Sequence, residues 1–171
     1  WMNVATGGVY LAWILLAAAQ AFFLGLWGLF FAGTGAMSWA RTWWGEAIAA
    51  SVLWVGIEQL RSRVPFGGFP WAKLAYSQVD APLIGLAPLA GEVIVSGACV
   101  VVAVWLRLAF SRAATAGAAG LRGPRGRVLL AASAALLYLA PAAISLPTAP
   151  QSGTALAAAI QGNVEIPMFE T

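Results

Sequence analysis

Two charged residues stand at a chemically useful spacing near the end of an apolar stretch. Glu58 and Arg61 are three residues apart, which puts them on one face of a helix and allows them to pair. Ionisable groups within membrane spans are costly and therefore mark candidate functional positions. Two roles are open to this pair: an interfacial ion pair that fixes where the helix leaves a membrane, or a site for a substrate head group. Glu92, directly after Gly91, fits the interior of a helix bundle or a helix end in the interface.

An aromatic segment rich in glycine and proline follows this pair. It reads VPFGGFPW at 64–71, and Tyr76, Ser77 and Gln78 come shortly after it. Its two glycines and two prolines exclude a regular helix there. Aromatic rings settle in the headgroup zone of a bilayer. The segment is therefore either an aromatic belt around a re-entrant turn or a wall beside a lipid-binding cavity.

Other catalytic chemistry finds little support in the sequence. With no histidine and one cysteine, the chain has neither the usual ligands of a zinc site nor an internal disulfide. Cys99 lies in an apolar run without a neighbouring base or cation, so we expect it to pack rather than react. No metal site, cofactor or catalytic residue is predicted. The net charge of +3 comes from scattered arginines rather than a basic stripe, which argues against a nucleic-acid partner.

Composition predicts the kind of fold that must position these residues. The 171-residue chain is 61% hydrophobic and 9% charged, whereas soluble domains are about 45–50% apolar and about 25% charged. So few charges cannot cover a water-facing surface, and a disordered chain needs the opposite composition. The predicted fold class is an all-α polytopic bundle embedded in a lipid bilayer.

Four stretches are long enough to cross a bilayer, which takes roughly 20 apolar residues. They lie at about 9–31, 44–60, 83–110 and 128–146. Arg41 and the five arginines of 107–127 fall on one side of these spans, and Arg61, Arg63 and Lys73 fall on the other. Because short basic loops stay in the cytoplasm, we expect both chain ends and the 61–82 loop to be extracytoplasmic.

Two domains are expected. Residues 1–150 form the transmembrane domain, in which the Ala-, Gly- and Arg-rich segment 111–127 is predicted to be a flexible cytoplasmic connector. Turn residues at 151–153 precede a short apolar run at 154–160 that is typical of a buried strand. Residues 151–171 are therefore predicted to begin an extramembrane domain.

The stretch from Leu53 to Glu92 contains a series of short motifs, in this order: Trp54, Glu58 and Arg61; Gly68 to Trp71; Tyr76 to Gln78; Pro82 and Leu83; and Leu86 to Gly91. This series resembles the membrane-domain signature of bacterial apolipoprotein N-acyltransferases. Residues 159–164 are similar to the first strand of the nitrilase-like domain that follows in this family.

The resemblance implies a bacterial plasma-membrane enzyme with eight transmembrane helices and an extracytoplasmic nitrilase-like α/β domain. A glutamate, a lysine and a cysteine act there: the cysteine takes an acyl chain from a phospholipid as a thioester and passes it to the α-amine of a diacylglyceryl-cysteine lipoprotein. None of this triad falls within residues 1–171, so the chain alone is expected to be inactive. Arg61 and Lys73 are expected to attract phosphate head groups. The expected substrate-binding residues, at the mouth of a membrane cavity, are Glu58, Arg61, Phe69, Trp71, Tyr76 and Gln78.

Two other functions remain open at this point. Related membrane modules occur joined to, or beside, a polyprenol-phosphate mannose synthase, where such a chain is a non-catalytic membrane anchor. A transporter fragment would explain a broken helix near Gly67, but transporters usually contain repeated halves and the sequence shows no repeat.

Overall fold

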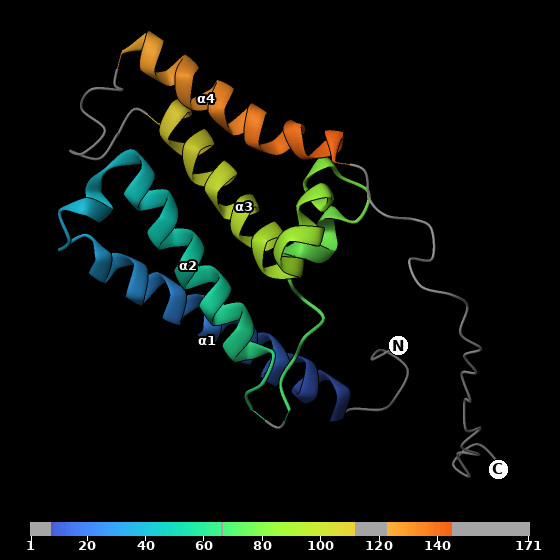
Figure 1. Cartoon of the computed structure of the whole chain (residues 1–171). Coiled ribbons are helices and arrows are strands. Elements are labelled where there is room, and N and C mark those ends of the chain that lie inside the picture. Colours follow the sequence, from blue (N-terminus) through green and yellow to red (C-terminus); the bar gives the residue numbers. More distant parts are fainter. Residues whose placement is uncertain (1–7, 66, 112–122, 145–171) are drawn as a thin grey trace, which may run out of the picture.

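A computed structural model describes residues 8–65, 67–111 and 123–144 (Figure 1). Within these ranges the chain is helical and contains no strand. The elements are α1 (Gly8–Thr34), η1 (Trp39–Arg41), α2 (Trp43–Arg61), η2 (Leu74–Gln78), η3 (Pro82–Leu86), α3 (Ala87–Phe110), α4 (Pro124–Leu139) and η5 (Ala140–Ala143), where η denotes a 3-10 turn.

The four α-helices run in alternating directions in one layered bundle. α2 packs between α1 and α3, and α4 packs on the other side of α3 (Figure 1). The residues that join α1 to α2 lie at one end of the bundle, and η2 and η3 lie at the other. η3 also contacts η5, so the end of α4 returns to the same end of the bundle as the segment between α2 and α3.

Three segments of the described chain are long and apolar enough to cross a membrane: Tyr10–Thr34, Pro82–Phe110 and Pro124–Ala143. They correspond to the first, third and fourth predicted spans. α2 is not among them, because Glu46, Glu58 and Arg61 lower its hydropathy. Its 19 residues nevertheless extend for about 28 Å, close to the roughly 30 Å thickness of a bilayer core. A four-span topology therefore remains a prediction.

Several predicted boundaries need correction. α1 continues three residues past position 31, to Thr34. α4 begins at Pro124 rather than at 128, so the prediction of a flexible connector is wrong for 124–127. The physical reason is that a proline needs no hydrogen-bond partner in the first helical turn and its fixed φ suits a helix start. The predicted strand at 154–160, and the domain of 151–171, lie outside the described residues.

Small residues allow α2 and α3 to approach closely. Ala47 and Ala50 of α2 are almost fully buried against α3. The Ser51 hydroxyl donates to the Gly97 carbonyl oxygen at 3.1 Å, and a Cβ at Gly97 would lie only 2.9 Å from that hydroxyl oxygen. Close backbone approach through small residues, with a polar bond across it, is a common way to join helices in membranes.

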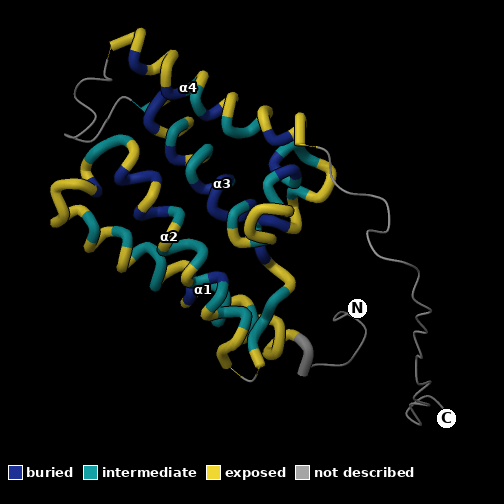
Figure 2. Tube along the Cα trace, viewed as in Figure 1, coloured by how far each residue is buried: buried dark blue, intermediate teal, exposed yellow. Residues whose placement is uncertain are grey.

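Burial is unevenly distributed over the bundle. Buried positions line α2, α3 and α4 where they face one another, whereas α1 is mostly exposed (Figure 2). Phe23 is the buried side chain of the described part of α1, and Trp27 donates its indole N–H to the Ala50 carbonyl oxygen at 3.2 Å. Cys99 packs against a core cluster formed by Ala75, Leu83, Val95 and Ala98, as predicted.

Candidate functional site

The end of α2 folds back on itself and begins the site. The backbone N–H of Phe69 donates to the Arg61 carbonyl oxygen at 2.8 Å, and that of Gly68 donates to Pro65 at the same distance. Gly68 has φ +81°, and a Cβ there would lie 2.2 Å from the Ser62 carbonyl carbon. Only glycine fits this close approach, so the turn itself requires glycine at position 68.

Glu58 anchors, from inside the bundle, the segment that follows the turn at Gly68 (residues 69–76, here called the returning chain). Its side chain is buried, with 4% of its surface exposed. Its Oε1 accepts hydrogen bonds from the Trp54 indole N–H at 2.9 Å and from the Leu74 backbone N–H at 2.8 Å. The carboxylate therefore satisfies a backbone group of η2.

Arg61 points toward α1 rather than toward Glu58. Its Nη1 donates to Gln20 Oε1 at 2.8 Å, and its Nη2 donates to the Ala72 carbonyl oxygen. The structure therefore does not pair Glu58 with Arg61, so the interfacial ion pair, one of the two roles left open for these residues, is not formed. Each side chain instead bonds a segment that the sequence places far away, because the fold-back of 62–72 brings new partners to both.

A small pocket opens beside Arg61. It encloses about 240 Å³ between α1, α2 and the returning chain. Three polar side chains, those of Gln20, Glu58 and Arg61, join an otherwise apolar lining made by Phe23, Leu24, Trp54, Ile57 and Ala72. A cationic group next to an apolar wall is suited to an amphipathic ligand.

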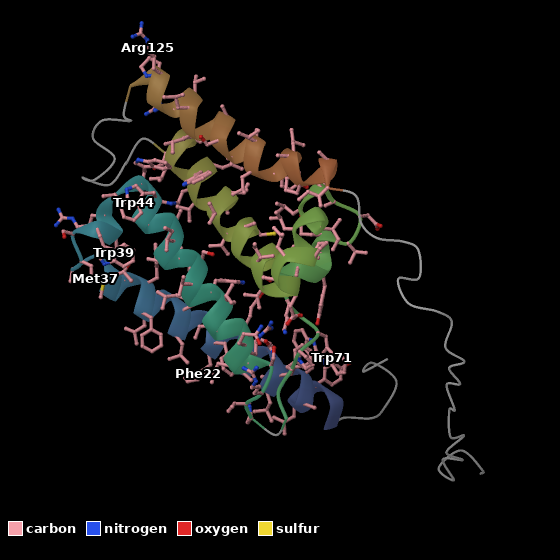
Figure 3. All side chains as sticks on the ribbon, viewed as in Figure 1. Phe22, Met37, Trp39, Trp44, Trp71 and Arg125 are labelled. Carbon is pink, nitrogen blue, oxygen red and sulfur yellow. The ribbon has the colours of Figure 1, made fainter. Side chains whose placement is uncertain are left out.

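The aromatic residues lie at the same end of the bundle. Phe69 and Trp71 meet edge to face, with ring centroids 6.2 Å apart. Trp71 is 71% exposed, and Figure 3 shows it at the opposite end of the molecule from Met37, Trp39 and Trp44. Gln78 donates to the Ser77 hydroxyl at 2.9 Å, while its own Oε1 is buried and has no hydrogen-bond partner among the described residues.

Glu92 is the centre of a polar cluster that the sequence does not predict. It forms an ion pair with Lys73, accepts from the Tyr76 hydroxyl at 3.2 Å and from the Gln59 amide at 3.4 Å. Lys73 is nearly buried, with 9% of its surface exposed. The available signal was an acidic residue within an apolar span and a lysine in the preceding loop, whose expected partners are phosphate head groups instead.

The structure brings several of the expected site residues together. The pocket brings Glu58 and Arg61 together, the ring pair joins Phe69 and Trp71, and Tyr76 bonds Glu92. Gln78 stands apart from these contacts. Across the described residues, no group of three or more acidic or cysteine side chains has an arrangement that could hold a metal ion.

A family model named for the apolipoprotein N-acyltransferase N-terminal domain matches residues 1–106 of the chain. The chain belongs to the apolipoprotein N-acyltransferase family. The matched range holds α1, α2, η2, η3 and most of α3. It therefore includes all six residues expected to bind substrate, together with Lys73 and Glu92.

Individual apolipoprotein N-acyltransferases agree with the family match. The chain is 38% identical to the enzyme from Pseudomonas putida and 38% identical to the enzyme from Azotobacter vinelandii, in each case over 70% of this chain. Identity to the one from Pseudomonas syringae pv. tomato is 32% over 95% of the chain. The chain spans 22%, 22% and 33% of these relatives, respectively. No solved structure matches it.

The acyltransferase family accounts for the apolar helices and indicates a bacterial membrane protein. The role as an anchor for a polyprenol-phosphate mannose synthase receives no support from the matched family or from these three relatives.

Proposed function

We propose that this chain is the membrane part of an enzyme that moves an acyl chain from a phospholipid to the N-terminal amine of a diacylglyceryl-cysteine lipoprotein. Membership of the apolipoprotein N-acyltransferase family supports the reaction class. The apolar helices support a bilayer setting, in which both substrates keep their acyl chains. The proposal places the substrate site at the η2–η3 end of the bundle, outside the cytoplasm.

The proposed reaction has two acyl transfers. A cysteine thiolate attacks the ester carbonyl of the phospholipid, a C–S bond forms, and the lysophospholipid leaves as an alcohol that takes the proton removed from the thiol. The lipoprotein amine then attacks the thioester, an amide forms, and the thiol regains a proton from that amine. The glutamate, lysine and cysteine assigned to these steps belong to a nitrilase-like domain beyond the residues of this chain.

The pocket beside Arg61 is the observation that carries the proposal. Its apolar wall suits the start of an acyl chain, and the Arg61 guanidinium suits a phosphate, since a guanidinium can donate to several oxygens at once. Lys73 is committed to Glu92 and nearly buried, so phosphate recognition is assigned to Arg61 rather than to both cations. Phe69 and Trp71 do not line the pocket itself, and their role is proposed to be a wall outside it at the same end of the bundle.

The test uses the intact enzyme encoded by the full reading frame, purified in detergent. Arg61→Gln should slow formation of the acyl-enzyme thioester about tenfold or more, because hydrogen bonds to charged groups contribute about 1.5–3 kcal/mol. Phe69→Ala should slow the same step by removing part of the wall. Arg63→Gln is the matched control, since Arg63 is an exposed arginine two positions away. Unchanged thioester formation in both Arg61→Gln and Phe69→Ala would refute the proposal.

A cellular measurement tests the reaction itself. The full-length protein should restore N-acylated lipoproteins in bacteria depleted of their own apolipoprotein N-acyltransferase, detected by mass spectrometry of the N-terminal lipopeptide. Lipoproteins that keep a free α-amine despite normal amounts of the protein would contradict the assigned reaction.

A further inference from the structure

Four consecutive residues after the aromatic segment are each held by a side chain of α2 or α3. Lys73 pairs with Glu92, the Leu74 N–H donates to Glu58 at 2.8 Å, and the Ala75 N–H donates to the Ser96 hydroxyl at 3.1 Å. Tyr76 then donates to Glu92 at 3.2 Å. An irregular backbone within a bundle needs such partners, because its polar groups have no helical hydrogen bonds of their own.

A break in α3 places Glu92 against this segment. Ala90 has φ −153° and ψ 30°, and Gly91 has φ +63° and ψ −148°, so the regular helix restarts at Glu92. A positive φ of this kind favours glycine. From this position the Glu92 carboxylate receives donors from α2 through Gln59 and from the returning chain through Lys73 and Tyr76.

Lys73 lies between two residues whose backbone groups bond side chains that line the pocket beside Arg61. The preceding residue, Ala72, accepts from Arg61 through its carbonyl oxygen, and the following residue, Leu74, donates to Glu58. Arg61 and Glu58 both line the pocket, as does Ala72 itself. A shift of the Lys73 backbone would therefore move the Ala72 carbonyl oxygen, which accepts from Arg61.

We propose that Glu92 and Lys73 are positioning residues that set the orientation of Arg61 and the aromatic wall outside the pocket through the backbone of 72–74. The catalytic consequence rests on the proposed function, whereas the effect on the backbone does not. Loss of Glu92 leaves a nearly buried ammonium without its carboxylate, and a charge in that situation draws water or moves outward. Loss of Lys73 removes the ion pair that ties this segment to α3. Ala72 then loses its fixed place, and Arg61 loses one of its two hydrogen-bond partners.

The bundle supplies a matched control at its other end. Arg107 of α3 pairs with Glu46 of α2, whose side chain is likewise mostly buried. This second pair also joins α2 to α3, but it lies far from the pocket beside Arg61. Glu46→Gln therefore reports the general effect of breaking an ion pair between these two helices.

The experiment compares Glu92→Gln, Glu92→Asp, Lys73→Met and Glu46→Gln in the full-length enzyme in lipid nanodiscs. Glu92→Gln and Lys73→Met should each raise the KM for the phospholipid donor about tenfold while kcat stays within about twofold, and Glu92→Asp should recover most of the loss. Hydrogen–deuterium exchange of peptides covering 73–78 should become at least about tenfold faster in the first two variants. Glu46→Gln should leave both the KM and this exchange as in the parent enzyme.

Two results would overturn the proposal. One is unchanged exchange at 73–78 in both Glu92→Gln and Lys73→Met. The other is an equal rise in exchange there in Glu46→Gln, which would indicate general loosening of the bundle. If Glu92→Gln fails to fold, the exchange at 73–78 in Lys73→Met and Glu92→Asp still tests the proposal. If the parent enzyme transfers no acyl chain, the proposed function fails, but the exchange measurement still tests the positioning.

Discussion

Glu58 of α2 and Leu74 of η2 are joined by a hydrogen bond of 2.8 Å from the Leu74 backbone N–H to Glu58 Oε1, across a sequence separation of 16. The same oxygen accepts from the Trp54 indole at 2.9 Å, and the carboxylate is buried. An ionisable residue in an apolar helix thus serves as the acceptor for a backbone group that would otherwise be unsatisfied. This relationship links the path of the aromatic segment to the body of the bundle.

Removing this acceptor should destabilise the protein. Glu58→Ala leaves the N–H groups of Leu74 and Trp54 without their partner, and each unsatisfied buried donor costs about 1–3 kcal/mol. Glu58→Gln keeps a carbonyl oxygen at the same place, so its loss of unfolding free energy should be less than half that of Glu58→Ala. Thermal unfolding in detergent measures the difference. Equal melting temperatures for Glu58→Ala and the parent protein would contradict the role of this acceptor.

Alanine substitutions at Gly67 and Gly68 allow the cost of steric crowding to be compared with the cost of backbone strain. Both residues have positive φ, +89° at Gly67 and +81° at Gly68, but a Cβ at Gly67 meets open space whereas one at Gly68 meets Ser62 backbone at 2.2 Å. Gly67→Ala should therefore cost about 1–2 kcal/mol of unfolding free energy, from strain alone. Gly68→Ala adds overpacking and should cost about 3 kcal/mol or more. Urea titrations of the two variants compare them directly, and similar losses would refute this account of the turn.

Substitution of a third glycine, Gly85, tests how closely η5, at the end of α4, packs against η3. A Cβ at Gly85 of η3 would lie 1.9 Å from the Pro141 carbonyl oxygen of η5, so Gly85→Ala should push these two turns apart and cost about 1–3 kcal/mol. A Cβ at Gly56 of α2 would have nothing within 4 Å, so Gly56→Ala should be neutral or stabilising by up to about 1 kcal/mol. Thermal melts show whether the two variants shift in opposite directions. A destabilised Gly56→Ala protein would contradict the open space at that position.

The helices could be predicted because apolar stretches of sufficient length leave few alternatives for a chain with so little charge. Trp43–Arg61 and Ala87–Phe110 fall close to the ranges that hydropathy gives. The start of α4 also carried a local signal, since Gly123 and Pro124 form a typical helix N-terminus. The location of the site at one end of the bundle follows from the order of the motifs along the chain.

The contacts within the site could not be predicted, because they depend on backbone conformations that hydropathy does not report. Glu58 and Arg61 share a helix face, yet the turn at Gly68 brings Leu74 to one and Ala72 to the other. The pairing of Lys73 with Glu92 needs both that turn and the break at Gly91. Local spacing rules such as i to i+3 pairing are weak, at about 0.2–0.5 kcal/mol, and a buried backbone donor outweighs them.

The four-span topology depends on α2, whose charged residues distinguish it from the other three helices, and cysteine labelling tests it directly. In a full-length protein in which Cys99 and every cysteine outside residues 1–171 are replaced by alanine, a single cysteine is introduced at Ser38→Cys, before α2, or at Asp80→Cys, after it; both positions are exposed. If α2 crosses the bilayer, a membrane-impermeant maleimide should label Asp80→Cys on intact cells and reach Ser38→Cys only after permeabilisation. Labelling of both positions from the same side would mean that α2 enters and leaves on one face, and the pocket beside Arg61 would then lose its assignment to the extracytoplasmic surface.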